Sequence, residues 1–97
     1  MTAPESRSAA FTAVIHGSVQ GVGFRYYTRS TAHRLGVYGY VQNQADGTVK
    51  VVCEGRRAAV TRMAEWLEIG PPSARVLRVD MQWHHQLRGY STFSVEF

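Results

Sequence analysis

The spacing of the apolar residues changes repeatedly along this chain, and this feature constrains the fold most. From residue 11 apolar and polar side chains alternate, so Phe11, Ala13 and Ile15 share one face of a strand that ends at Gly17. From about residue 23 the spacing lengthens to that of a helical stripe, and Gly36 follows as a left-handed C-cap. The members of this stripe are Phe24, Thr28, Ala32 and Leu35. The pattern therefore predicts a strand, a glycine-rich loop and a helix, in that order.

The same change of spacing recurs in the rest of the chain. Residues 37–42 and 49–54 are of strand type, and the Asp46-Gly47 pair between them favours a hairpin turn. An amphipathic helix then carries its apolar face on Val60, Met63, Ala64 and Leu67. The Gly70-Pro71-Pro72 segment ends this helix. A fourth strand alternates its apolar residues at Leu77, Val79, Met81 and Trp83, and a short last strand does so at Phe93, Val95 and Phe97.

The order of these elements is βαββαβ with an added C-terminal strand, which predicts an α+β, ferredoxin-like sandwich. Two helices should cover one face of an antiparallel sheet. A strand–helix–strand crossover makes the first two strands parallel, so their carboxyl ends should lie at one edge. This places the glycine loop, residues 17–23, beside Asn43. With 97 residues, we expect one domain over residues 9–97 after a flexible tail, residues 1–8.

Charge and cysteine content limit the partners and the compartment. The formal net charge is +4 and the pI about 9.7, which favours anionic partners. No carboxylate occurs between Glu5 and Asp46, so the first half of the chain should face the anion. The sequence has no apolar run long enough for a membrane span and no secretory signal. A single cysteine, Cys53, suits a reducing compartment. We therefore expect a soluble cytoplasmic protein with no membrane partner. A monomer is a separate expectation, which charge and cysteine content do not decide.

The segment between the first strand and the first helix has three glycines within residues 17–23. Backbone N–H groups in such a loop can turn inward and join the helix N-terminus in binding an anion. An ordinary glycine-rich turn explains the glycines equally well. Arg25 supports the anion-binding interpretation. The helix dipole disfavours a cation in the first helical turn, so another interaction should hold Arg25 there. A guanidinium beside the loop would instead grip two phosphoryl oxygens.

Asn43 is the only asparagine of the chain and falls where the second strand meets the hairpin. It is either a turn residue that bonds its own backbone, or an amide that holds a water molecule in position. Composition alone leaves both interpretations open.

Taken together, the glycine loop, Asn43, the hairpin turn and the Gly70-Pro71-Pro72 segment resemble the acylphosphatase family, from about residue 11 to residue 97. The resemblance implies hydrolysis of the carboxyl–phosphate bond of small acyl phosphates, with inorganic phosphate as product and no cofactor or metal. It implies that Arg25 grips the phosphate and that Asn43 positions the attacking water. The residues that match the phosphate-binding signature are Val19, Gln20, Gly21, Val22, Gly23 and Phe24. The chain departs from the family at Tyr40, where tryptophan is common, and this puts local packing in question.

Two other functions remain to be weighed. RNA-recognition domains share the order of elements, but they place stacking aromatics on the third strand, which here has none. We therefore expect no nucleic-acid partner. A catalytically silent phosphate-binding or regulatory domain of the same fold stays open, although Arg25 and Asn43 argue against it.

The histidines and the tyrosines of the loop region have structural interpretations. His84 and His85 are neighbours on a strand, so they point to opposite faces and cannot chelate one ion together. His16 stands at the end of the first strand, where it either lies near the phosphate or is an edge residue. Tyr26 and Tyr27 should shelter the rim of the pocket.

Overall fold

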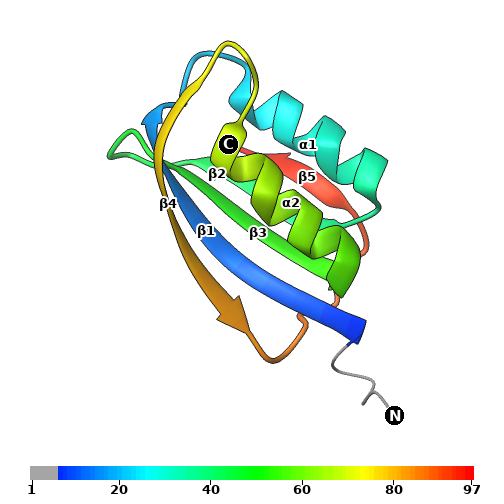
Figure 1. Ribbon diagram of the computed structural model, residues 1–97. Coiled ribbons are helices and arrows are strands. Elements are labelled where there is room, and N and C mark those ends of the chain that lie inside the picture. The colour runs from blue at the N-terminus through cyan, green and yellow to red at the C-terminus, as the bar shows by residue number, and fades with distance from the viewer. Residues whose placement is uncertain (1–6) are drawn as a thin grey trace.

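The computed structural model describes residues 7–97, and these form a five-strand sheet with two helices on one face (Figure 1). Most of the predicted tail, residues 1–8, lies outside the described residues, and Ser8 already belongs to the first strand. The strands are β1 (Ser8–Ser18), β2 (Tyr38–Asn43), β3 (Val49–Arg56), β4 (Arg75–His84) and β5 (Phe93–Glu96); the helices are α1 (Phe24–Leu35) and α2 (Arg57–Ile69).

The order of strands in the sheet is β4-β1-β3-β2-β5. The first four strands form the expected antiparallel sheet, with β3 between β1 and β2. The additional strand β5 pairs parallel with β2, which makes the whole sheet mixed. Because β1 and β2 both run opposite to β3, they are parallel to each other. The ferredoxin-like prediction is confirmed.

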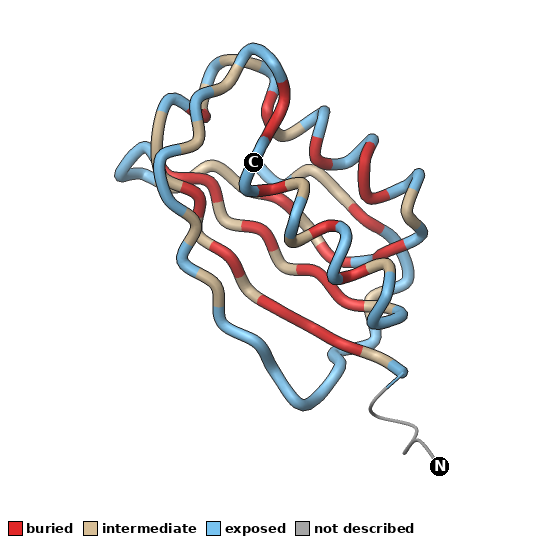
Figure 2. The backbone as a smooth tube through the Cα atoms, viewed as in Figure 1, coloured by how far each residue is buried: buried red, intermediate tan, exposed pale blue. Residues whose placement is uncertain are grey.

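The core lies between the helices and the sheet, as the buried positions in Figure 2 show. Phe11, Ala13 and Ile15 are fully buried on the helix-facing side of β1, as their alternation predicts. Helix α1 begins at Phe24 and ends at Leu35, and Gly36 follows as the expected left-handed C-cap with a φ of 76°. Burial of these apolar side chains away from water is the main force that holds the helices on the sheet. Helix α2 contributes Val60, Met63 and Leu67.

Three positions of the apolar alternation predicted for the last two strands are exposed. Phe97 lies beyond the end of β5 and is 86% exposed. Trp83 is 48% exposed and contacts the Phe11 ring edge to face, with ring centroids 5.4 Å apart.

Leu77 was expected to point inward, but it is 70% exposed. The pairing of β1 with β4 shifts between His16 and Gly17, so that Gly17 lies opposite Val76 and His16 opposite Arg78. The extra residue of this β-bulge is Leu77, and Val76 takes its place against the core.

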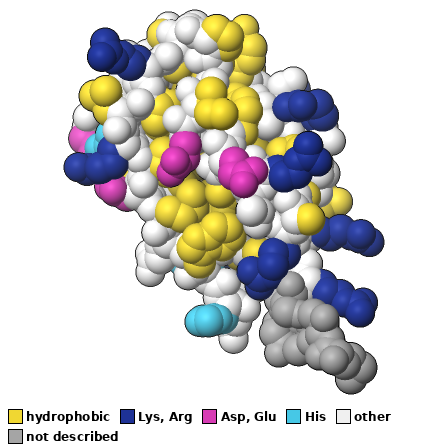
Figure 3. All heavy atoms as spheres, in the orientation of Figure 1, with side chains coloured by type: hydrophobic (Ala, Val, Ile, Leu, Met, Phe, Trp, Pro, Cys, Tyr) yellow, Lys and Arg dark blue, Asp and Glu magenta, His cyan; other side chains and the backbone are white. Residues whose placement is uncertain are grey.

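Charged side chains on the helix-covered face are unevenly placed. Figure 3 shows most of the basic side chains of this face along its right-hand edge, with acidic side chains near its centre and at its left-hand edge. Among the described residues, no helix is long and apolar enough to cross a membrane.

Candidate functional site

Three chain segments that are distant in sequence meet at one end of the molecule (Figure 1). The carboxyl ends of β1 and β2 share an edge of the sheet because the two strands are parallel. Strand β5 is parallel to β2, so its carboxyl end also lies at this edge. The loop between β1 and α1, the residue Asn43 and the end of β5 therefore come together.

A cavity of about 180 Å³ lies at this edge. Its lining comes from the loop, the first turn of α1 and the end of β2, and no carboxylate is among the lining residues. The lining residues are Val19, Gly21, Gly23, Phe24, Arg25, Tyr26 and Asn43. The structure thus brings Arg25, Asn43 and four of the six predicted loop residues around one cavity. Tyr26 lies at the cavity as expected and is exposed.

The glycine loop presents free hydrogen-bond donors. Gly21 and Gly23 have φ angles of 74° and 76°, a left-handed conformation that side chains disfavour. Gly23 is the N-cap of α1, and no side chain caps the helix or places an acid in its first turn. Within residues 7–97, the N–H groups of residues 21–25 donate no hydrogen bond to the protein. Unpaired N–H groups at a helix N-terminus form an anion-binding site.

The guanidinium of Arg25 is held by the end of β5. Its Nη1 donates a hydrogen bond to the carbonyl oxygen of Glu96 at 3.1 Å. The ring centroid of Phe97 lies 4.6 Å from the Arg25 Cζ atom, a cation–π contact. These contacts use one donor and one face of the guanidinium, which leaves other N–H groups for a ligand. The supporting role of Glu96 and Phe97 was missed at the sequence level, since nothing local to Arg25 indicates it.

Asn43 has an unsatisfied oxygen. Its Oδ1 atom is buried and accepts no hydrogen bond from any described residue. Most buried polar side-chain atoms have a partner, so an orphan acceptor at a cavity indicates a missing donor. The turn interpretation of Asn43, in which its side chain bonds the nearby backbone, therefore fails for this oxygen.

Two of the predicted loop residues do not line the cavity. Gln20 directs its side-chain amide to the hairpin, where Nε2 donates to the carbonyl oxygens of Gln44 at 2.7 Å and Thr48 at 2.8 Å. Val22 is partly buried, and its carbonyl oxygen accepts a hydrogen bond of 2.8 Å from the Ser73 hydroxyl. Any contact of Gln20 with an anion must therefore come from its backbone, while its side chain fixes the loop to the strand that carries Asn43.

The hairpin beside Asn43 is fixed by Asp46. Its Oδ1 accepts hydrogen bonds from the Thr48 hydroxyl at 2.6 Å and from the Thr48 N–H at 3.0 Å. These bonds favour the charged carboxylate and lower the pKa of Asp46. The side chain of Asp46 therefore stabilises the predicted hairpin turn, and this turn holds the end of β2 in position.

No histidine lines the cavity at Arg25. The prediction that His84 and His85 point to opposite faces of a strand is wrong, because β4 ends at His84 and both residues line a second cavity. His16 Nε2 lies 2.9 Å from the Asp80 carboxylate, and this hydrogen bond lowers the pKa of Asp80. His84 forms a hydrogen bond of 2.8 Å with the Thr12 hydroxyl. Among residues 7–97, no group of three or more His, Cys, Asp or Glu side chains is arranged to hold a metal ion.

These features define a class: a small ferredoxin-like sandwich with an uncapped glycine loop, an anchored arginine and an orphan amide oxygen at one sheet edge. Comparison with known proteins points to one family. The acylphosphatase family model matches residues 11–95. An acylphosphatase of Actinobacillus succinogenes is 46% identical over 82 residues, which cover 84% of this chain and 91% of that protein.

Solved structures give the same result. The acylphosphatase from Coxiella burnetii superposes with a TM-score of 0.89 at 35% identity, covering 99% of this chain and 100% of the other. The Bacillus subtilis acylphosphatase gives a TM-score of 0.88 at 30% identity, with coverages of 92% and 99%. The chain belongs to the acylphosphatase family, which confirms the predicted family and the predicted enzyme class, an acylphosphatase hydrolase.

Proposed function

We propose that this chain hydrolyses small acyl phosphates to a carboxylate and inorganic phosphate, with Arg25 and the loop N–H groups binding the phosphoryl group and Asn43 orienting the water. The observation that carries this mechanism is the orphan Oδ1 of Asn43. Asn43 lines a cavity at which Arg25 and the loop amides are hydrogen-bond donors. The oxygens of a phosphoryl group can accept hydrogen bonds from these donors, and an attacking water can donate one to the Asn43 oxygen.

Hydrolysis of an acyl phosphate requires no general acid or base from the protein. The water oxygen bonds to phosphorus while the bond between phosphorus and the acyl oxygen breaks, and the leaving carboxylate keeps the electron pair. A carboxylate is stable as an anion at neutral pH, so no general acid is needed. Asn43 cannot remove a proton, and the water proton passes to a phosphoryl oxygen. The transition state carries negative charge on the equatorial oxygens, which the N–H groups and Arg25 stabilise.

The experiment is hydrolysis of benzoyl phosphate by the purified protein in EDTA, beside Arg25→Ala, Arg25→Lys and Asn43→Ala. By analogy with removal of one oxyanion donor, Asn43→Ala should lower kcat about 100- to 1,000-fold. Arg25→Ala should lower kcat/KM at least as much, and lysine should not restore it because it lacks the planar fork. Arg75→Ala, an exposed arginine outside the cavity lining, is the matched control.

Two results would overturn the mechanism. Near-parental turnover by folded Arg25→Ala or Asn43→Ala would remove that residue from it. No turnover by the folded parent, with inorganic phosphate still raising its Tm, would support the silent phosphate-binding domain instead.

A cytoplasmic location and a monomeric state stay predictions, the first resting on the single buried thiol of Cys53. Size-exclusion chromatography with light scattering tests the second.

A further inference from the structure

A second and larger cavity lies on the sheet face away from the helices. Its volume is about 490 Å³, within the range of small-molecule sites. The floor includes Thr12, Tyr40 and Lys50 from the three central strands, and the walls come from the end of β4 and the segment that leads to β5. It shares no lining residue with the cavity at Arg25. We call it the outer-sheet cavity.

One wall of the outer-sheet cavity is fixed by a buried carboxylate. Glu54 is only 4% exposed and accepts three backbone hydrogen bonds from the segment between β4 and β5. Its Oε1 accepts from the Arg88 N–H at 2.8 Å, and its Oε2 accepts from the N–H groups of Gly89 at 2.8 Å and Tyr90 at 3.1 Å. The wall is therefore held in place before any ligand binds, which reduces the entropy cost of binding.

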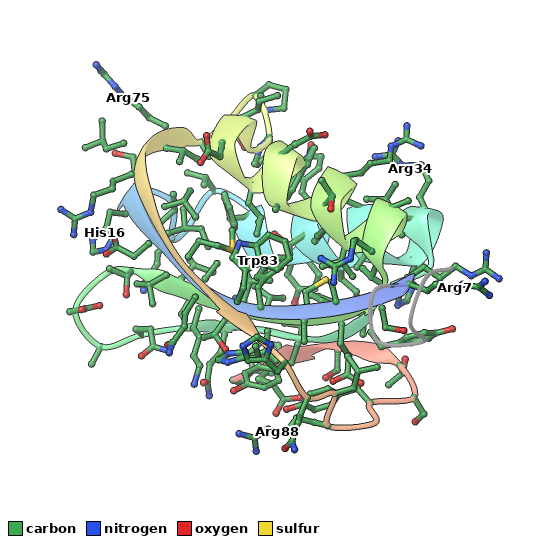
Figure 4. All side chains as sticks on the ribbon, turned by 60° about the horizontal axis from the view of Figure 1, so that its bottom comes forward. Arg7, His16, Arg34, Arg75, Trp83 and Arg88 are labelled. Carbon is green, nitrogen blue, oxygen red and sulfur yellow. The ribbon has the colours of Figure 1, made fainter. Side chains whose placement is uncertain are left out.

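The outer-sheet cavity has unbalanced positive charge. Lys50 and Arg88 line it, and neither side chain forms an ion pair within residues 7–97. Glu54 is the one acid in the lining, so two cations face a single carboxylate, whose oxygens already accept the three N–H groups. Figure 4 shows Arg88 on the side of the sheet away from the helices. A net positive charge in a concave site favours an anionic ligand.

The outer-sheet cavity also offers aromatic surface. The rings of Tyr40 and Tyr90 meet edge to face, with centroids 6.0 Å apart. The Lys50 ammonium lies 5.8 Å from the centroid of Tyr40. A planar ring can pack against these tyrosines while its anionic group reaches Lys50. The tyrosine that departs from the family pattern, Tyr40, is thus part of this cavity.

We propose that the outer-sheet cavity binds a small anion that carries a planar aromatic ring, with the ring on Tyr40 and Tyr90 and the anionic group between Lys50 and Arg88. Aromatic carboxylates and nucleoside monophosphates share this chemistry. The proposal does not depend on catalysis, because the site at Arg25 is separate.

The test is chemical-shift mapping of the ¹⁵N-labelled protein with benzoate, AMP and inorganic phosphate in separate titrations. Benzoate, AMP or both should shift the amides of Lys50, Arg88 and Tyr90 in a saturable way, and which one binds tighter distinguishes the two sources. Inorganic phosphate alone should leave these amides in place and shift the glycine loop.

The matched variants are Lys50→Met and Arg88→Met, which keep an apolar stem and remove the charge. Each should weaken binding about tenfold or more, whereas Arg75→Met should leave it unchanged. The proposal is overturned if neither aromatic anion shifts these amides at about 10 mM. It is also overturned if both Met variants, folded by their spectra, bind as tightly as the parent.

Discussion

Glu54→Gln is the most informative stability test, because one buried carboxylate joins the sheet to the segment before β5. The carboxylate oxygens accept N–H bonds from Arg88, Gly89 and Tyr90. A glutamine keeps one acceptor oxygen and turns an NH₂ group toward at least one of these donors. Losing one hydrogen bond to a charged group costs about 1.5–3 kcal/mol. We therefore expect a loss of about 1.5–3 kcal/mol in the free energy of unfolding, because these part-buried N–H groups can still reach water.

The measurement is urea and thermal unfolding of Glu54→Gln beside the parent. For a domain of this size, the Tm should fall by about 6 °C or more. Glu65→Gln replaces an exposed carboxylate on α2 by the same chemistry and should leave the midpoint unchanged. A midpoint for Glu54→Gln equal to that of Glu65→Gln would refute the assignment of Glu54 as the anchor of this segment. Accelerated amide exchange at Gly89 and Tyr90 should accompany the loss.

Four further changes have defined outcomes. Gln20→Ala removes two bonds between loop and hairpin, so the unfolding free energy should fall by about 1–3 kcal/mol, read by urea unfolding, with turnover of benzoyl phosphate reduced. Phe97→Ala removes the ring beside the Arg25 guanidinium and should lower kcat/KM about two- to fivefold; an unchanged value would show that Phe97 does not position Arg25. The pKa of Asp80 is lower in the folded protein than in the unfolded chain, so ionised Asp80 stabilises the fold at pH values above the unfolded pKa. This stabilisation is lost as the pH falls through the folded pKa, and Asp80→Asn should flatten the curve of unfolding free energy against pH below about pH 4. Burial raises the pKa of Cys53 from 9.0 to about 12, so the neutral thiol favours the folded state. Its contribution to stability is complete below the unfolded pKa and is lost as the pH rises between the two values. The native protein should therefore resist iodoacetamide at pH 10, and Cys53→Ala should flatten the curve of unfolding free energy against pH in alkali.

The sequence predicted most of the residues that line the cavity at Arg25, because part of the information is local. The glycine loop and Arg25 belong to one continuous segment, so strand, loop and helix could be recognised from spacing. Asn43 required one further step, the rule that a crossover makes two strands parallel. The side-chain roles were less accessible. Gln20 stands inside the signature, but its amide turns to the hairpin, and this depends on how β3 packs beside β1.

The sequence by itself determined the order of the elements, the faces of β1 and of the two helices that enter the core, and the glycine loop before the first helix. Those properties depend on neighbours a few residues apart, so the periodicity of apolar side chains and the glycines encode them.

Only the tertiary structure decided what surrounds these elements. The bulge that turns Leu77 outward depends on the register between β1 and β4. The bond from Arg25 to Glu96 and the three bonds to Glu54 join residues far apart in the chain. The parallel pairing of β5 with β2 brings Glu96 to the site edge. Such contacts follow from strand order and register, which no short window of sequence contains, because their partners meet only when the whole core is buried.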